Sequence, residues 1–366
     1  MKISIVGTHG IPGNYGGFET FAEELSLLLV KNNHEVLVQC DSGSYQYNDY
    51  KGVQLFYSSV TKSRNPFRFY YKGLLMALRQ SDIVLVAGAG GAIFYILNKF
   101  YRKILITNTD GIESQRSKWP ITHKLFLKFS ERLAVRLSDF IVADSEAINI
   151  YLSATCKSGK SKIRTIEYGA PIISSYDENI LDKYDIHFSR YYLVVCRLEP
   201  ENNIRMIIDG FLASETDKKL IIIGNLSGNK YVAQLIKDYQ DKRIRFLGGI
   251  YDKSELSTIR FGCKAYIHGH SVGGTNPSLL EAMGCGNISI CHDNVFNREV
   301  TGDNQLYFSS TDECTVRINE VEMMDILQSK KLKESGQSRI RNLYNWETIV
   351  SKYEKLIEEA SVNNRQ

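Results

Sequence analysis

The amino-acid sequence predicts an α/β protein with two Rossmann-like domains, each built on a parallel sheet, that face each other across a cleft. Short β-branched runs alternate with amphipathic segments along most of the chain, which is the pattern of parallel strands joined by crossover helices. A polar stretch at residues 173–190 interrupts this rhythm, and a new strand-like run begins at Tyr191. With 366 residues, the chain is long enough for two full hydrophobic cores.

The strand-like runs are short and rich in Ile, Val and Leu. In chain order they are Ile3–Val6, Glu35–Gln39, Val53–Tyr57, Ile83–Ala87, Ile104–Thr107, Phe140–Ala143, Leu193–Cys196, Leu220–Ile223, Ile244–Leu247, Ala265–Ile267 and Ile288–Cys291. We therefore expect an N-terminal domain at 1–172, a linker at 173–190, a second domain at 191–345 and a C-terminal amphipathic helix at 346–366. Open parallel sheets bind ligands at the carboxyl ends of their strands, so the candidate sites are sought there.

Composition narrows the class of protein. A charged fraction of 23% and a hydrophobic fraction of 43% are typical of a globular protein, and no apolar run is long enough to span a bilayer. Met1 leads directly into a strand, so we expect a cytoplasmic protein. Seven scattered cysteines without metal-ligand spacing indicate reduced thiols rather than disulfides or a zinc site.

The formal net charge of +4 is unevenly distributed. Residues 1–170 hold 21 Lys and Arg against 14 Asp and Glu, whereas residues 171–366 hold 24 against 27. The basic N-terminal half is therefore the part expected to meet an acidic partner, such as the inner face of an anionic membrane. A helix expected after Trp119 and Pro120 carries several cations beside an apolar stripe that includes Leu125 and Phe129, which we expect to be buried. Its cationic face fits either plain solvation or contact with lipid headgroups.

The first strand ends in a glycine-rich stretch, with five glycines between Gly7 and Gly17. Glycines allow the backbone to approach a ligand closely, and the helix expected from about Phe18 directs its N-terminus to the same place. The spacing does not match GxGxxG, so no dinucleotide cofactor is predicted. The alternative is a long surface turn.

Two later strand ends carry polar side chains. Asp110 and Glu113 follow the strand that ends near Asn108, so they should point into the cleft, although an Asp-Gly pair is also a common turn. Arg197 follows the first strand of the second domain. A cation at that position can neutralise a phosphate, and the alternative is an ordinary surface arginine.

The segment from His268 to Gly286 has the clearest local pattern. A strand ends in His268, Gly269 and His270, glycines follow at 273 and 274, and Asn276 and Pro277 are a helix N-cap and first position, with Gly284 and Gly286 as the exit. A glycine turn followed by a helix start presents backbone N–H groups to an anion. Glu281, one turn into the helix, repels phosphate but can accept hydrogen bonds from a ribose diol. The segment is typical of a nucleotide-diphosphate site, and the alternative is a capped helix with Glu281 on a solvated face.

This segment also resembles the signature of the retaining glycosyltransferases of family four, which have the GT-B fold. Glu281-Ala282-Met283 matches the second half of the family's pair of glutamates, whereas Gly273 occupies the position of the first. The resemblance implies a ribose-binding role for Glu281 and donor contacts from His268, His270, Gly274, Thr275 and Asn276. The segment after Val195 is similar to the family's Gly-Arg-Leu-x-x-x-Lys, with Arg197 in register and Asn202 at the lysine position. It implies half of a cationic clamp on the leaving diphosphate.

A second resemblance is to a rhamnosyltransferase-like subgroup, whose chains begin with Gly-Thr-x-Gly-Ile-Pro followed by Tyr-Gly-Gly-Phe-Glu-Thr, as residues 7–12 and 15–20 do here. It implies donor contacts from Gly16 and Gly17 and acceptor-side roles for Tyr15, Asp110 and Glu113. Asp110 stands where many family members have a histidine near the donor sugar. In such folds the last helix commonly crosses back to the N-terminal domain.

The resemblance implies transfer of L-rhamnose from dTDP-rhamnose to a lipid-linked saccharide in bacterial surface polysaccharide or capsule synthesis, with retention and without a metal, because there is no Asp-x-Asp motif. Stabilisation of the leaving diphosphate is the main chemical demand, met by Arg197 and the helix N-termini. A UDP-hexose donor remains an alternative. So does a nucleotide-sugar-binding protein without turnover, because Gly273 and Asn202 replace two family residues.

Overall fold

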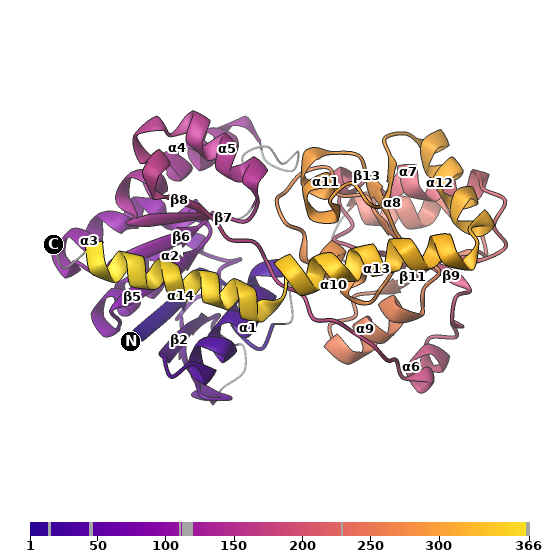
Figure 1. Cartoon of the computed structure of the whole chain (residues 1–366). Coiled ribbons are helices and arrows are strands. Elements are labelled where there is room, and N and C mark those ends of the chain that lie inside the picture. The colour runs from indigo at the N-terminus through magenta and orange to yellow at the C-terminus, as the bar shows by residue number, and fades with distance from the viewer. Residues whose placement is uncertain (14–15, 44–46, 110, 112–119, 228–229, 364–366) are drawn as a thin grey trace. The chain divides into compact units, whose positions relative to one another are not determined.

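The structure, a computed structural model, describes residues 1–13, 16–43, 47–109, 111, 120–227 and 230–363. The chain divides into two compact units (Figure 1). Unit 1 contains Met1–Tyr168 and Trp346–Gln366, and unit 2 contains Gly169–Asn345. Among the described residues, no helix has the length and apolar content needed to cross a membrane.

Unit 1 is an α/β unit in which strands and helices alternate. Its strands are β1 (Lys2–Val6), β2 (Glu35–Cys40), β3 (Asp49–Tyr50), β4 (Val53–Tyr57), β5 (Ile83–Ala87), β6 (Ile104–Asn108), β7 (Phe140–Ala143) and β8 (Ile163–Thr165). Its helical segments are α1 (Gly17–Lys31), α2 (Pro66–Gln80), η1 (Ala89–Leu97), α3 (Asn98–Tyr101), α4 (Ile121–Leu137), α5 (Glu146–Thr155), η3 (Lys157–Lys162) and α14 (Trp346–Asn363).

The sheet of unit 1 has the order β3-β4-β2-β1-β5-β6-β7-β8, and all neighbours are parallel except β3 and β4. The chain starts at the centre of the sheet, moves outward to β4 and returns to β5, so the strand order reverses between β1 and β5. Right-handed crossovers place α1 on one face and α2, η1, α4 and α5 on the other. β5 and β6 are buried along their whole length, as expected for strands covered by helices on both faces.

The last helix, α14, belongs to unit 1 although it follows unit 2 in the chain. The hydroxyl of Tyr353 accepts a hydrogen bond of 3.0 Å from the side-chain amide of Asn108, at the end of β6, and its ring lies 5.5 Å from that of Phe21 in α1. Two ion pairs also hold α14: Lys352 pairs with Glu167, and Glu359 pairs with Arg164. Packing of this helix therefore completes one face of the first unit.

Unit 2 has a second α/β arrangement. Its strands are β9 (Tyr191–Val195), β10 (Lys219–Ile223), β11 (Ile244–Gly248), β12 (Ala265–His268), β13 (Ser289–His292) and β14 (Leu306–Phe308). Its helical segments are α6 (Glu178–Lys183), η4 (Pro200–Asn202), α7 (Ile204–Ala213), α8 (Lys230–Asp238), α9 (Lys253–Gly262), α10 (Pro277–Gly284), α11 (Val295–Thr301), α12 (Thr311–Met323) and α13 (Ile326–Leu343).

The polar stretch 173–190, which the sequence predicts to be a linker, lies inside unit 2, and the unit begins at Gly169. Its backbone is held there by the hydrogen bond from Ile173 N–H to the carbonyl of Gly284, 3.1 Å. The same stretch contains α6, whose N-cap Asp177 accepts from the N–H of Asn179. Most of the stretch, including Ser174, Glu178 and Lys183, is exposed to solvent, which accounts for its polar composition.

The sheet of unit 2 is fully parallel, in the order β11-β10-β9-β12-β13-β14. Tyr192, Ile222 and Ile267 in its strands pack with Ile207 of α7 and Phe308 of β14 in one buried core. The strand order reverses between β9 and β12. Both units therefore have the doubly wound, Rossmann-like topology that the sequence predicts, with three short strands (β3, β8 and β14) added to the predicted ones among the described residues.

Candidate functional site

The point at which the strand order of unit 2 reverses lies between the carboxyl ends of β9 and β12, where open sheets of this class bind ligands. The segments that leave these two strands are residues 196–203 and 269–276. They are joined by hydrogen bonds from Ser271 N–H to the carbonyl of Glu201, 3.1 Å, and from the side-chain amide of Asn203 to the carbonyl of Gly269, 2.9 Å. Arg197 and the glycine turn at 273 and 274 are thus carried on one hydrogen-bonded assembly of loops.

Arg197 is exposed, and in the described part of the chain its side chain makes no ion pair or hydrogen bond. Asn202 is buried, and its side-chain amide donates a hydrogen bond of 2.6 Å to the carbonyl of Arg197. A neutral, buried amide cannot replace the lysine of the family pattern as a charge. Asn202 instead braces the loop that presents Arg197.

The sequence predicts free N–H groups at the start of α10, but the structure shows that the first-turn donors are already used. Pro277 has no N–H, Ser278 donates to the side chain of the N-cap Asn276 at 3.0 Å, and Leu279 donates to the carbonyl of Asn276 at 3.1 Å. The chain itself uses these first-turn donors. The N–H groups of Gly273 and Gly274, in the turn before the helix, have no acceptor in the described residues, so an anion would find its donors there.

Gly273 has a φ of 146°, a backbone conformation that residues with a side chain rarely adopt, although a Cβ there would meet only open space. The glutamate that the family has at this position would therefore have to be accommodated by a different backbone.

Glu281 is paired with Arg260 of α9, whose Nη2 lies 2.6 Å from Oε2. Arg260 is buried and also donates to the hydroxyl of Ser278 at 3.2 Å. That hydroxyl donates in turn to the carbonyl of Val195, the last residue of β9, at 3.0 Å. The chain of contacts ties the α10 helix to the end of β9. The Glu281 side chain remains 27% exposed, and its Oε1 has no partner in the described residues.

Arg260 was not among the residues that the sequence predicts for the site. The available signal was an arginine directly after Ile259 on the inner side of a helix, where an apolar residue would be expected. Its carboxylate partner is 21 positions away in the sequence and could not be identified without the fold.

The two histidines of the site differ in exposure. His268 is buried, its burial lowers the pKa of the imidazole to about 3, and neither ring nitrogen has a hydrogen-bond partner in the described residues. Its ring stacks on that of His270 at a centroid distance of 4.4 Å. His268 is therefore neutral near pH 7, and only His270, which is partly exposed, reaches the surface.

The glycine-rich loop of unit 1 is folded back on the helix that follows it. Glu19 accepts a hydrogen bond from the N–H of His9 at 2.9 Å, and Glu23 accepts from the N–H of Gly13 at 2.8 Å. Burial raises the pKa of Glu19. These donors are thus engaged within the chain. Gly16, the N-cap of α1, has no side chain that could cap the helix, and a Cβ there would lie 3.0 Å from Oε2 of Glu19, so a carboxylate stands beside this helix start.

Three residues of the predicted site, Tyr15, Asp110 and Glu113, lie outside the residues that the structure describes. The strand that leads to Asp110 ends at Asn108, at the carboxyl edge of the unit 1 sheet.

The prediction that Leu125 and Phe129 are buried in α4 is wrong. Both are exposed, whereas Ser130, Ala134 and Val135 are the buried residues of the helix. The reason is that α4 packs through small side chains on η1, where the hydroxyl of Ser130 donates to the carbonyl of Ala89 at 2.7 Å.

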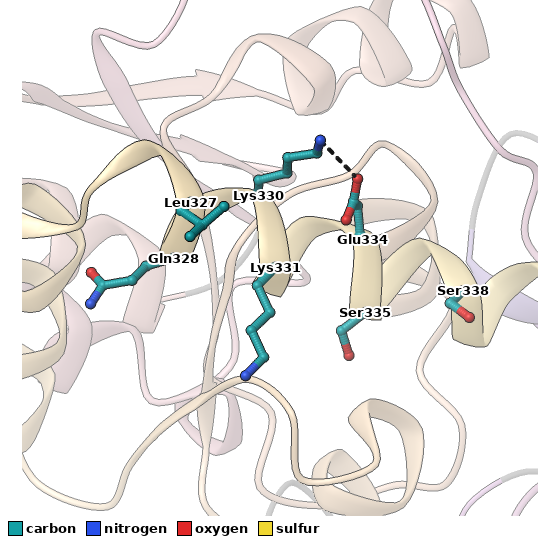
Figure 2. A pocket seen from close by; sticks show the side chains of 7 residues that line it. All are labelled: Leu327, Gln328, Lys330, Lys331, Glu334, Ser335 and Ser338. Atoms are coloured by element: carbon teal, nitrogen blue, oxygen red, sulfur yellow. Dashed lines mark ion pairs between the residues drawn. The ribbon is translucent and has the colours of Figure 1, made fainter.

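Unit 2 also has a surface hollow that is not at the strand ends. Figure 2 shows its lining side chains, from Leu327 to Ser338, all on α13. A hollow lined by one helix has no opposing wall to enclose a ligand, and these residues do not include the strand ends.

Two family descriptions match the chain. Residues 178–339 match "Glycosyl transferases group 1", and residues 1–171 match a domain of unknown function, DUF1972. An uncharacterized glycosyltransferase of Methanocaldococcus jannaschii is 23% identical over 98% of both chains. O-antigen chain mannosyltransferase B of Escherichia coli is 24% identical over 57% of this chain and 55% of its own length.

Solved structures with the same architecture cover nearly the whole chain. Sucrose-phosphate synthase from Thermosynechococcus elongatus has a TM-score of 0.81, 13% identity and 99% coverage of both chains. HepE from Anabaena, in complex with UDP-glucose, has a TM-score of 0.79, 17% identity and coverage of 98% of this chain and 100% of its own. At these identities the likeness concerns the fold, which is two parallel-sheet, Rossmann-like units of the GT-B type.

Proposed function

We propose that the chain transfers L-rhamnose from dTDP-rhamnose to a lipid-linked saccharide. The match of residues 178–339 to the glycosyl transferases group 1 family and the similarity to a glycosyltransferase over nearly the whole chain support a hexosyltransferase that uses a nucleotide sugar. The anomeric configuration is retained and no metal ion takes part. The C1–O bond to the diphosphate breaks with its electron pair, the acceptor oxygen bonds to C1 on the same face, and a diphosphate oxygen takes the acceptor's proton.

One observation carries the assignment of the donor site. Arg197 is exposed and has no ion-pair partner in the described residues, at the end of β9, on the loop that is hydrogen-bonded to the segment containing Gly273 and Gly274. An unpaired cation and two unused backbone donors at a strand-order reversal suit a leaving diphosphate, on which charge develops in the transition state. In this proposal Arg197 and the N–H groups of Gly273 and Gly274 form the diphosphate site. His270, Thr275 and Asn276 lie around it, and the ring of His268 stacks on that of His270.

Glu281 would bind the ribose. Arg260 holds one carboxylate oxygen, and Oε1 is available to accept from a vicinal diol. Near this carboxylate a phosphate would be repelled, so the nucleoside end of the donor is the part that fits.

The donor sugar and the acceptor rest on the resemblance of residues 7–20 to the rhamnosyltransferase-like subgroup. The relative named as an O-antigen mannosyltransferase supports a place in surface polysaccharide synthesis. Gly16 and Gly17 at the start of α1 would contact the donor, and Tyr15, Asp110 and Glu113 would serve the sugar and acceptor side. A lipid-linked acceptor would bring the protein to the cytoplasmic face of the membrane.

A competing donor is a UDP-hexose, since HepE was solved with UDP-glucose. The deciding experiment uses purified full-length protein, a chelator, and dTDP-rhamnose, UDP-glucose, UDP-galactose or UDP-N-acetylglucosamine. Nucleotide release is followed with and without a lipid-linked glucose or N-acetylglucosamine acceptor, and the anomeric configuration of the product is read by NMR.

Acceptor-dependent release of dTDP alone, with a retained anomer, is the expected result. Release from a UDP-sugar would replace the donor in the proposal. Binding of nucleotide sugars without turnover would leave a nucleotide-sugar-binding protein, and an inverted product would overturn the mechanism.

A further inference from the structure

The solvent side of α4 carries large apolar side chains. Ile121, Leu125 and Phe129 follow one another at intervals of four residues, which places them on one helix face. They are between 56% and 76% exposed. Single exposed apolar residues are common on protein surfaces, but three in succession along one helix need a physical reason.

The neighbouring segments extend this apolar surface. η1 and α3 expose Ile93, Ile96 and Phe100, of which Phe100 is 83% exposed. α4 and η1 are in direct contact through Ser130 and Ala89. We call the six residues Ile93, Ile96, Phe100, Ile121, Leu125 and Phe129 the α4–η1 patch.

Helix α2 joins the same surface. Its Phe67 ring lies 5.7 Å from that of Phe126 in α4, and its Tyr71 ring lies 5.4 Å from that of Phe94 in η1. Phe67 and Tyr71 are themselves exposed. The apolar surface therefore extends over four segments of unit 1, α2, η1, α3 and α4.

The charge of these segments is almost entirely positive. Residues 66–80, 89–103 and 121–137 together hold 10 Lys and Arg (3 + 3 + 4) and one acid, Glu131. Lys128, Arg132 and Arg136 are exposed on α4, and none makes an ion pair within the described part of the chain. Cations that outnumber the acids ten to one and flank exposed apolar side chains complement an anionic surface that has an apolar interior.

We propose that the α4–η1 patch docks unit 1 on an anionic lipid bilayer, with the apolar side chains between the headgroups and the cations against lipid phosphates. A protein partner would more often match unpaired cations with acids of its own and would not need six aliphatic or aromatic anchors in a predominantly basic surround. This inference rests on the proposed function in one respect, because a lipid-linked acceptor gives the enzyme a reason to be at the bilayer.

The test measures flotation of the full-length protein with vesicles of phosphatidylcholine alone or with phosphatidylglycerol added. We expect binding to the anionic vesicles, weakened by salt. The Leu125→Glu/Phe129→Glu variant should bind at least about tenfold more weakly, because two anchors are replaced by charges. The matched control is Val316→Glu on α12 of unit 2, which changes a side chain of similar exposure, 56%, and should bind as the wild type does.

A second pair of variants separates charge from insertion. Lys128→Gln/Arg132→Gln should weaken binding to anionic vesicles by about fivefold for each cation, whereas Lys237→Gln on α8 should not. Because all these positions are exposed, their thermal unfolding midpoints should match that of the wild type, which excludes misfolding as the cause.

Three outcomes would overturn the proposal: unchanged binding of Leu125→Glu/Phe129→Glu, equal loss in Val316→Glu, or a lipid-free dimer that the Leu125→Glu/Phe129→Glu change dissociates. Transfer of sugar to a short-chain, water-soluble acceptor is measured in parallel. Sugar transfer without vesicle binding would refute the proposal that the α4–η1 patch binds membranes, but not the proposed function. Patch-dependent vesicle binding without transfer from any donor would refute the proposed function, but not membrane binding by the patch.

Discussion

The guanidinium of Arg260 lies 2.6 Å from the carboxylate of Glu281, and the same guanidinium donates to the hydroxyl of Ser278 one turn earlier in α10. Arg260 is buried, whereas Glu281 is partly exposed. The pair therefore has one desolvated partner, and it fixes the orientation of the carboxylate relative to the end of β9, to which Ser278 is bonded. Arg260 is a positioning residue in this arrangement.

Replacement of Arg260 by Met should lower the free energy of unfolding of unit 2 by about 2 kcal/mol, because Glu281 and Ser278 lose a partner and the surrounding pocket loses a charge-assisted contact. The exposure of Glu281 keeps the loss below that of a fully buried pair. In the transfer reaction the KM for the donor should rise more than kcat falls. Arg260→Lys should recover stability in part.

A double-mutant cycle with Glu281→Gln measures the coupling directly. Urea unfolding of the four proteins should give an interaction energy of about 1 kcal/mol or more. Strict additivity of the two single changes, in both stability and KM, would contradict the positioning role.

Arg197→Ala should lower kcat/KM by a factor of about 10² to 10³ with little effect on the unfolding transition, because the side chain is exposed and makes no contact to lose in the described structure. The matched control is Arg190→Ala. Arg190 is also exposed, but it pairs with Asp217 before β9 begins, at the opposite end of the strand from Arg197. Steady-state kinetics in which both variants lose activity equally would remove Arg197 from the diphosphate site.

The sequence was sufficient to predict the two Rossmann-like sheets, since fully buried parallel strands such as β5 and β10 are nearly continuous apolar runs. It was also sufficient for α10, whose N-cap Asn276 and first residue Pro277 carry a local signal that the structure reproduces. Short edge strands such as β3, with two residues, have too little pattern to be recognised.

Features that depend on tertiary contacts could not be predicted. The ion pair of Arg260 with Glu281 joins two helices, and no sequence periodicity relates them. The exposure of Leu125 and Phe129 reverses the usual rule that an apolar stripe faces the core, because small residues such as Ala134 take the packed side of α4 instead. The sequence predicts free N–H groups at the start of α10, but the capping bonds to Asn276 use the donors of Ser278 and Leu279. The unused N–H groups are therefore those of Gly273 and Gly274.

Stability should fall in mild acid because of His268. Burial lowers the pKa of its imidazole from 6.5 to about 3, so the unfolded chain binds a proton that the folded chain does not. The stability contributed by the neutral ring is present above pH 6.5 and is lost as the pH falls towards 3, with a loss of about 2 kcal/mol between pH 7 and 5. His292, whose pKa is also lowered by burial, acts in the same direction.

Urea unfolding at pH 7, 6 and 5 measures this loss. His268→Phe keeps an aromatic ring against His270 and has no titratable group, so its stability should depend less steeply on pH than that of the wild type by about 2 kcal/mol over this range. Identical pH profiles for the two proteins would mean that folding does not lower the pKa of His268.

Any side chain introduced at Gly273 should strain the backbone. With a φ of 146° and open space around the missing Cβ, Gly273→Ala should lower the free energy of unfolding by about 1 to 2 kcal/mol through backbone strain alone. The same substitution should weaken donor binding, because relief of the strain moves the N–H groups of Gly273 and Gly274. Gly43→Ala is the matched control for strain, since Gly43 has a φ of 84° and equally open space but is not one of the residues assigned to the site. Gly273→Glu, which restores the family's glutamate, should likewise bind the donor more weakly than the wild type by isothermal titration. Tighter binding or faster transfer by Gly273→Glu would instead show that the turn accepts a glutamate and that its absence, rather than the backbone, limits this enzyme.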